Sequence, residues 1–167
     1  MGAPVKYITL TNSTHRALID DEDYAQLAHK TWRMNRSGYA ERSICLADGR
    51  EKRGAIMLHR EIMSPPADME VDHINGDRLD NRRANLRIVT KQQNRQNIGK
   101  QSHREMTSRY KGVVQHPKTL RWRAIVKTGG KQRHLGYFAT EHEAALAYNT
   151  AARELFGEFA RLNEVQL

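Results

Sequence analysis

The sequence predicts an α+β protein in three consecutive parts, and three observations lead to this prediction. Short runs in which apolar and polar residues alternate are typical of strands and recur through residues 1–57. A strand, a polar loop, a second strand and a helix follow within residues 58–98. After a polar stretch at residues 99–109 that is typical of a linker, residues 110–167 hold three strand patterns and one long amphipathic helix.

The N-terminal part is predicted to be rich in β-strands. Its strand patterns cover residues 6–10, 17–19, 32–34 and 39–44, and turns are expected at Ser37–Gly38 and Asp48–Arg50. Between the second and third strands, Asp20 is a predicted N-cap, and the acidic residues after it favour a short helix. The residues of this part indicate no chemistry of their own.

The central part begins with a short helix at residues 58–63, which a Ser-Pro-Pro sequence ends. Residues 70–74 and 86–89 are predicted strands, separated by a loop rich in Asn, Asp and Arg. Thr90 and Gln93 have the spacing of a capping box, so a helix should begin there and run to about residue 98.

The C-terminal part has strand patterns at residues 110–115, 121–127 and 133–138. Two consecutive glycines predict a hairpin turn between the second and third of these strands. A capping sequence at residues 140–143 begins an alanine-rich helix, and Gly157 should end it.

Positive charge is concentrated in one segment. Lys and Arg total 28 and Asp and Glu total 19, which gives a net charge of +9. Residues 78–133 hold 16 basic and 2 acidic side chains, and the rest of the chain is mildly acidic. This asymmetry favours the binding of a polyanion, above all nucleic acid, over a merely well-solvated surface.

Composition excludes several classes of protein. No stretch approaches 18 consecutive apolar residues, which argues against a membrane span, and the N-terminal residues lack a signal-peptide pattern. Cys45 is the single cysteine, so an intramolecular disulfide and a multi-cysteine zinc site are excluded. We therefore expect an intracellular protein, in the cytoplasm of a bacterial host, that does not bind a membrane.

The central part contains side chains suited to hydrolysis of a phosphodiester. Asp72 and His73 are adjacent in a predicted strand, so their side chains should point to opposite faces. Histidine can act as a general base near neutral pH, and a carboxylate is a preferred ligand of Mg²⁺. Asn94, on the following helix, can add its amide oxygen to the same ion. Taken singly, Asn85 also fits a turn and Asn94 a solvated helix position.

Taken together, these residues resemble the HNH nucleases. The Asp72-His73 pair is followed by Asn85, twelve residues after His73, and by Asn94, twenty-one residues after it. The likeness extends over Leu58-His59-Arg60, Val71–Asp77 and Asp80–Arg87. It is nearest to the phage-intron homing type, in which the final residue of the motif is Asn instead of His.

This resemblance implies a ββα-metal fold and a role for each matched residue. His73 would be the general base, Asp72 and Asn94 would bind metal, and Asn85 would orient His73 across the hairpin. One divalent ion per site, Mg²⁺ or Mn²⁺ rather than zinc, is implied. For His59, an accessory contact with the DNA backbone or leaving group and a packing role are both open.

The C-terminal part resembles the plant AP2/ERF DNA-binding domains over about 55 residues. The resemblance is carried by Tyr110–Val113, Trp122–Ala124, Leu135–Phe138, Glu143–Ala152 and Gly157–Asn163. It implies a three-stranded sheet that enters the major groove and a helix that packs on the other face. Plant proteins have Arg or Trp at several positions that are Val114, Ile125 and His134 here, so the plant base preference is not carried over.

Alternation along the second strand agrees with this arrangement, because Trp122, Ala124 and Val126 fall on one face and basic residues on the other. The predicted DNA contacts are Arg121, Arg123 and Lys127 on the second strand, Gln132 and His134 on the third, Lys111 and His116 on the first, and Arg82, Arg83, Arg87 and Arg95 in the basic segment.

The sequence therefore predicts a metal-dependent DNA endonuclease of the homing type, from a phage or a bacterium, with an HNH core and an AP2-like module that targets double-stranded DNA. One such site cuts one strand, so a monomer would nick and a homodimer would be able to cut both strands. Two alternatives stay open. One is a non-catalytic AP2-type DNA-binding regulator with a decayed nuclease core, and the other is a structure-specific junction or repair nuclease.

Overall fold

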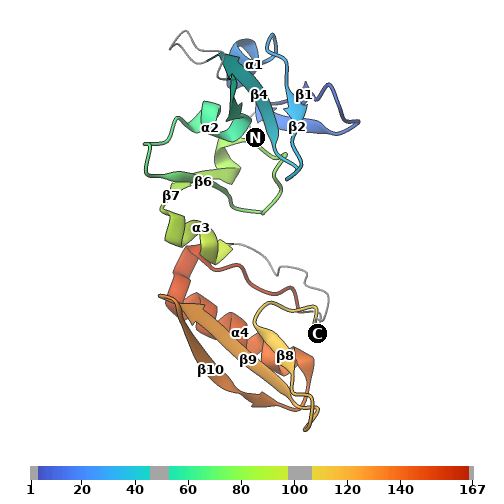
Figure 1. Ribbon diagram of the computed structural model, residues 1–167, viewed down its shortest axis with the longest axis vertical. Coiled ribbons are helices and arrows are strands. Elements are labelled where there is room, and N and C mark those ends of the chain that lie inside the picture. Colours follow the sequence, from blue (N-terminus) through green and yellow to red (C-terminus); the bar gives the residue numbers. More distant parts are fainter. Residues whose placement is uncertain (1–3, 46–52, 98–106, 166–167) are drawn as a thin grey trace. The chain divides into compact units, whose positions relative to one another are not determined.

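The computed structural model describes residues 4–45, 53–97 and 107–165 and confirms the predicted α+β class (Figure 1). The chain divides into two units, residues 1–94 and residues 95–167. The turn predicted at Asp48–Arg50 and most of the predicted linker lie outside the described residues. Within the described ranges, no helix has the length and apolar character that a bilayer crossing requires.

Small antiparallel sheets and short helices make up the N-terminal unit. In chain order its elements are β1 (Val5–Thr9), β2 (Arg16–Asp20), α1 (Asp21–Leu27), β3 (Arg33–Met34), β4 (Ala40–Cys45), β5 (Arg53–Met57), α2 (Leu58–Met63), β6 (Glu70–His73), β7 (Leu86–Val89) and α3 (Lys91–Asn97), whose last three residues belong to the second unit. β1 pairs with β2, β4 lies between β3 and β5, and β6 pairs with β7. Sequence alternation did not predict β5, because Gly54 interrupts the pattern.

One hydrophobic core joins the N-terminal strands to the central motif. Ile19 from β2, Leu58 from α2 and Leu86 from β7 belong to the same buried cluster. Trp32 is also buried there, and its indole N–H donates to the carbonyl oxygen of Leu27 at 2.9 Å, as a buried indole requires. The N-terminal strands and the central motif therefore fold around a shared core.

The predicted strand-loop-strand-helix motif is present at residues 70–97. β6 and β7 pair in a register that places Asp72 opposite Arg87 and His73 opposite Leu86. Because side chains alternate along a strand, Asp72 and Arg87 share one face of the hairpin and His73 lies on the other. The predicted capping box at the start of α3 is confirmed, because Thr90 and Gln93 exchange hydrogen bonds between side chain and backbone N–H.

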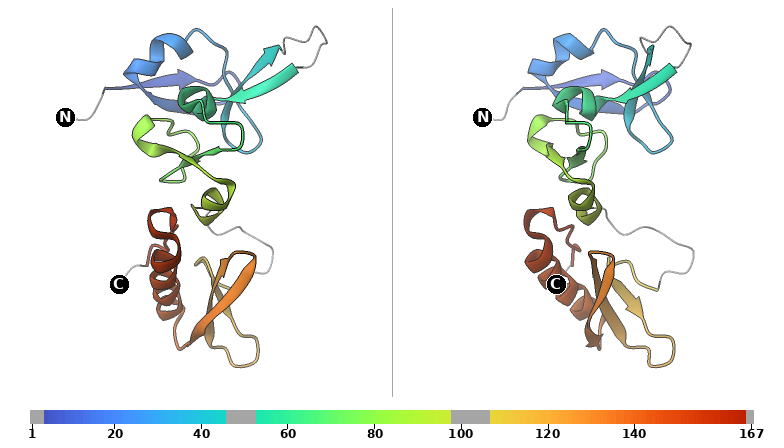
Figure 2. Two further views of the ribbon diagram at one scale, coloured as in Figure 1. Left: turned by 90° about the vertical axis from the view of Figure 1, so that its left-hand side faces the viewer. Right: turned by 60° about the vertical axis from the view of Figure 1, so that its left-hand side comes forward.

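A three-stranded antiparallel sheet with one long helix packed on it forms the C-terminal unit (Figure 2). Its elements are β8 (Val113–Gln115), β9 (Trp122–Thr128), β10 (Lys131–Phe138) and α4 (Glu141–Phe156), with β9 in the middle of the sheet. Ala124 and Val126 of β9 are buried against the alanine-rich side of α4, as the alternation predicted.

Local signals set the ends of these elements. Thr140 and Glu143 form the predicted capping box of α4, and Gly157 ends the helix at a φ of 54°. Gly129 and Gly130 form the hairpin turn between β9 and β10, with φ values of 55° and 75°. Two positive φ angles in succession favour glycine at both positions.

Candidate active site

His73 lies at the end of β6 with 5% of its surface exposed and faces the core of the N-terminal unit. Its ring is 4.9 Å from the ring of His59 and 5.9 Å from that of Tyr39, measured between centroids. Burial lowers the pKa of His73, although the hydrogen bond to Asn81 and the charge of Asp72 oppose the change. A lowered pKa favours the neutral ring, which is the form that accepts a proton.

The amide of Asn81 contacts the His73 ring, with 3.3 Å between Oδ1 and Nε2. An amide oxygen accepts and does not donate, so this contact places a proton on Nε2 and the ring lone pair on Nδ1. Asn81 is fully buried. Sequence reasoning missed its role, because the loop has several Asn residues and no periodicity that distinguishes them.

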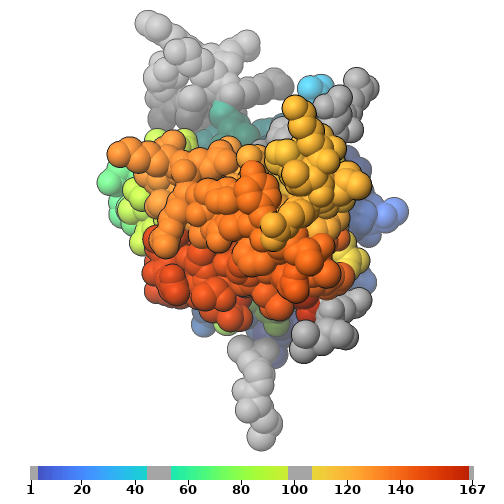
Figure 3. Space-filling model, turned by 90° about the horizontal axis from the view of Figure 1, so that it is seen from below, coloured from blue at the N-terminus to red at the C-terminus, as the bar shows by residue number. Residues whose placement is uncertain are grey.

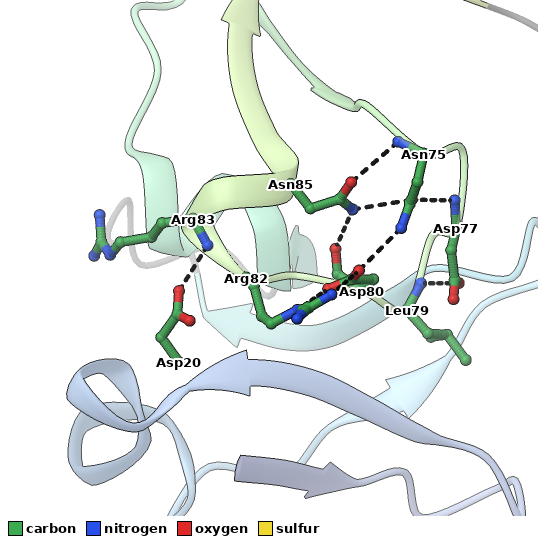
Figure 4. A network of polar contacts seen from close by, with 8 residues as sticks. All are labelled: Asp20, Asn75, Asp77, Leu79, Asp80, Arg82, Arg83 and Asn85. Atoms are coloured by element: carbon green, nitrogen blue, oxygen red, sulfur yellow. Dashed lines mark hydrogen bonds and ion pairs between the residues drawn. The ribbon is translucent and has the colours of Figure 1, made fainter. Parts of the chain in front are cut away.

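Asn85, which the family resemblance assigned to the orientation of His73, holds the loop instead (Figure 4). Its amide nitrogen donates to the carbonyl oxygen of Asp80 at 2.8 Å and to Asn75 Oδ1 at 3.0 Å, and its amide oxygen accepts from the backbone N–H of Asn75 at 3.0 Å. In this structure Asn81, and not Asn85, is the asparagine at His73.

Side chains also fix the other turns of the loop between β6 and β7. Asp80 accepts two hydrogen bonds from the guanidinium of Arg82 and one from the amide of Asn75 (Figure 4). Asp77 accepts from the backbone N–H of Leu79 at 2.9 Å. The loop that carries Asn81 is therefore held by its own polar groups.

The N-terminal segment braces the same loop. Leu18 of β2 donates its N–H to the carbonyl oxygen of Leu79 and accepts from the N–H of Asn81, both at 2.8 Å. Asp20, predicted as an N-cap, makes no side-chain cap and accepts the N–H of Arg83 at 2.7 Å instead (Figure 4). Residues for which the sequence suggested no chemistry thus position the asparagine that contacts His73.

On the opposite face of the hairpin, Asp72 is 6% exposed and its Oδ2 accepts two hydrogen bonds from Arg87, at 2.8 and 2.9 Å. Glu70 lies two residues earlier on this face. The second predicted metal ligand, Asn94 of α3, reaches the same strand by donating from Nδ2 to Glu70 Oε2 at 2.5 Å.

The chemistry of these donors fits a hard divalent ion. Asp72 offers a carboxylate, and the amide oxygen of Asn94 accepts no hydrogen bond from the described residues. Oxygen ligands of this kind suit Mg²⁺ and Mn²⁺, which keep several waters. In the described part of the chain, no three His, Cys, Asp or Glu side chains group to hold a metal.

His59 has a packing role in this structure. It is 5% exposed, and burial, with smaller contributions from His73 and Arg60, lowers its pKa to about 3. A buried neutral ring carries no positive charge to a phosphate. Its ring packs against His73 and Tyr39. A contact of His59 with the DNA backbone or the leaving group stays a prediction.

Three of the arginines predicted to contact DNA have carboxylate partners within the N-terminal unit. Arg82 pairs with Asp80, Arg83 with Glu22 and Asp23, and Arg87 with Asp72. Arg87 is largely buried, so its guanidinium orients Asp72 and does not form a free DNA-binding surface. Arg95, on α3, is exposed as a DNA contact requires.

The predicted basic face of the C-terminal sheet is present on the side away from α4. Arg123, Ile125 and Lys127 alternate with the buried residues of β9, and across the sheet they pair with Tyr137, His134 and Gln132 of β10. The exposed Arg121 donates to the carbonyl oxygen of Tyr137 at 2.9 Å. In Figure 3 the strands of this unit appear in yellow to orange beside the red helix.

Two aromatic details of this face were not predicted. The ring of Tyr137, which is exposed, lies 5.8 Å from the ring of His116 and 4.9 Å from that of His134. The exposed face therefore combines cations with rings that can stack.

Lys111 does not join the sheet face. Its ammonium donates to the carbonyl oxygen of Gln96 at 2.8 Å, and burial, with the charge of Arg161, lowers its pKa to about 8. The residue precedes β8, because that strand begins at Val113 and not at residue 110 as predicted. The predicted place of Lys111 on the sheet face is therefore corrected, and its contact with DNA stays a prediction.

Comparisons with known proteins agree with the geometry of the N-terminal unit. A family model described as HNH endonuclease matches residues 64–96. An uncharacterised HNH endonuclease of Acanthamoeba polyphaga mimivirus is 35% identical over 140 residues, which is 80% of this chain and 67% of that protein. Protein 3.8 of Escherichia phage T7 is 32% identical over 96 residues, which is 58% of this chain and 77% of that protein.

The C-terminal unit is similar to a different group. An AP2-like ethylene-responsive transcription factor of Arabidopsis thaliana is 42% identical over 62 residues, which is 37% of this chain but 13% of that protein. The likeness to this plant protein is thus confined to a small part of its length. No solved structure gives a significant match.

Proposed function

The chain belongs to the HNH endonucleases, and from that premise we propose that it is a metal-dependent DNA endonuclease of the homing type whose C-terminal unit selects the site on double-stranded DNA. The observation that carries the proposal is the hairpin of β6 and β7. It presents His73, neutral and in contact with Asn81, next to Asp72 in the chain.

His73 acts as the general base. Asn81 contacts Nε2 and holds the ring, and the neutral ring takes up the proton of the attacking water. A base that is already neutral near pH 7 needs no prior deprotonation. The brace from Leu18 keeps Asn81, and through it the ring, in one orientation.

Asp72 and Asn94 would hold Mg²⁺ or Mn²⁺, one ion per site, and the ion neutralises charge on the scissile phosphate when bound. Arg87 holds one carboxylate oxygen of Asp72 and so fixes the direction of the group. The protein thus sets the orientation of the two ligand groups, the carboxylate of Asp72 and the amide of Asn94.

The C-terminal sheet binds the duplex through its exposed face. Arg121, Arg123 and Lys127 contact phosphates, while Gln132 and His134 reach base edges, as polar side chains on a strand in the major groove can. The likeness to plant AP2-like transcription factors supports this assignment. A monomer with one such site nicks, and a homodimer cuts both strands.

Plasmid cleavage by the full chain, with Mg²⁺ or Mn²⁺ and with a chelator, tests the proposal. His73→Ala should lower the rate by about 10²–10⁴-fold and leave DNA affinity unchanged, because general-base loss has this size. His29→Ala, at an exposed position outside the site, is the matched control. A His73→Ala rate within about threefold of the parent would contradict the assignment of the base.

The same assay separates the alternatives. Duplex binding without cleavage in either metal would favour the AP2-type regulator with a decayed core. Faster cleavage of a four-way junction than of a duplex would favour the structure-specific nuclease.

A further inference from the structure

Asn94 can bind a cation through one end of its amide and not through the other. The two ends have nearly the same shape, but the oxygen has lone pairs and the NH₂ group has only protons to offer. A metal site that uses Asn94 therefore needs something to decide which end faces the ion. The structure gives the NH₂ group a partner, because Nδ2 donates to Glu70 Oε2 at 2.5 Å.

We propose that Glu70 is a positioning residue of the metal site and that its carboxylate selects the metal-binding orientation of Asn94. This inference rests on the proposed metal dependence. An ionised carboxylate is an acceptor and cannot donate, so it holds the NH₂ end and leaves the oxygen for the ion. Partners that orient a ligand in this way are a general feature of metal sites.

The charges around Glu70 also favour a cation at this face of the hairpin. Asp72 is neutralised by Arg87, as Asp80 is by Arg82. Glu70 is half-buried, and no cationic side chain of the described residues pairs with it. Among the described residues, Glu70 therefore adds a negative charge to the hairpin face that carries Asp72, and a divalent cation would balance this charge.

The position of Glu70 fits this role. It lies on β6 two residues before Asp72, and alternation puts both carboxylates on one face of the hairpin. Asn94 reaches this face from α3, so one strand supplies the anionic ligand and the group that orients the neutral ligand.

The experiment measures Mn²⁺ binding to the full chain without DNA, by isothermal titration calorimetry and by the EPR signal of free Mn²⁺. Glu70→Gln keeps the shape but removes the charge, and its new NH₂ group can donate to the Asn94 oxygen and turn the amide round. Mn²⁺ affinity should fall about 10–100-fold, the usual effect of losing a partner that orients a metal ligand. Asp68→Asn, exposed and two residues away, controls for the general loss of a negative charge.

A reciprocal exchange separates positioning from folding. In the double variant Glu70→Gln with Asn94→Asp, the amide on the strand donates, and the carboxylate on the helix offers one oxygen to that amide and the other to the ion. Mn²⁺ affinity should return to within a few-fold of the parent. If Glu70→Gln alone loses its circular-dichroism spectrum, the double variant decides the matter: restored affinity supports the inference and absent affinity overturns it.

The outcomes distinguish this inference from the proposed function. Equal Mn²⁺ affinity of the parent, Glu70→Gln and Asp68→Asn overturns the role of Glu70 and leaves the nuclease proposal standing. A parent that binds neither Mn²⁺ nor Mg²⁺ overturns the proposed metal dependence and this inference together.

Discussion

Gly112 lies between the sheet and the helix of the C-terminal unit, and Gly112→Ala should destabilise that unit selectively. An added Cβ would lie 2.2 Å from Cδ2 of Tyr148, on α4, and 2.5 Å from the carbonyl oxygen of Ile125, on β9. Neither neighbour can move freely, because Tyr148 is buried and Ile125 donates its N–H to the carbonyl oxygen of Gly112 at 2.8 Å. The backbone φ of +74° also disfavours any L-residue.

The expected loss of stability follows from these two effects. A left-handed conformation costs an alanine about 1–2 kcal/mol, and overpacking of a filled site adds about 1–3 kcal/mol. Gly130→Ala is the matched control, since its φ is +75° but nothing lies within 4 Å of the added Cβ. The difference between the two variants isolates the clash.

Each unit contains one of the two tryptophans, Trp32 in the first and Trp122 in the second. A urea titration of 5-fluorotryptophan-labelled chain, followed by ¹⁹F NMR, therefore reports the units separately. With a slope of about 1 kcal/mol per molar urea, the Trp122 midpoint should fall by about 2 M or more in Gly112→Ala and by about 1–2 M in Gly130→Ala. The Trp32 midpoint should not change.

Site preference in DNA cleavage should depend on whether the C-terminal unit is folded. At urea concentrations that unfold only the C-terminal unit of Gly112→Ala, nicking should persist and site preference should disappear. Equal Trp122 midpoints in the two variants would refute the packing argument, and a parallel shift of Trp32 would refute the independence of the units.

Two further predictions follow from the sites already described. Because burial lowers the pKa of His59 to about 3, the unfolded chain takes up the proton first as the pH falls below 6.5. As the pH falls from 6.5 to 3, the free energy of unfolding should therefore decrease by up to about 1.4 kcal/mol per pH unit. Urea melts at several pH values should show a weaker dependence of this free energy on pH in His59→Phe. The exposed control His29→Phe should keep the dependence of the parent. Arg123→Ala and Lys127→Ala should each reduce the slope of log K against log salt by about 0.9 in duplex binding, if each removes one phosphate contact. Arg153→Ala, on α4, should leave the slope unchanged, and an equal effect at all three positions would argue against the sheet face as the binding surface.

Much of the fold could be predicted because its signals are local. The capping boxes at Thr90 and Thr140, the turn at Gly129 and Gly130 and the alternation of β9 involve residues a few positions apart. The same holds for Asp72 and His73, whose opposite faces follow from adjacency in a strand. β5 escaped prediction because a short, interrupted strand has too weak a pattern without its partner.

The sequence by itself determined which residues carry the chemistry, their order and their spacing from Asp72 to Asn94, since these are properties of the chain. The tertiary structure decided what each residue touches. Asp20 meets Arg83 across 63 positions, and Leu18 holds the loop that brings Asn81, in place of Asn85, to His73. Such contacts depend on how the core packs distant segments together, and no periodicity records them.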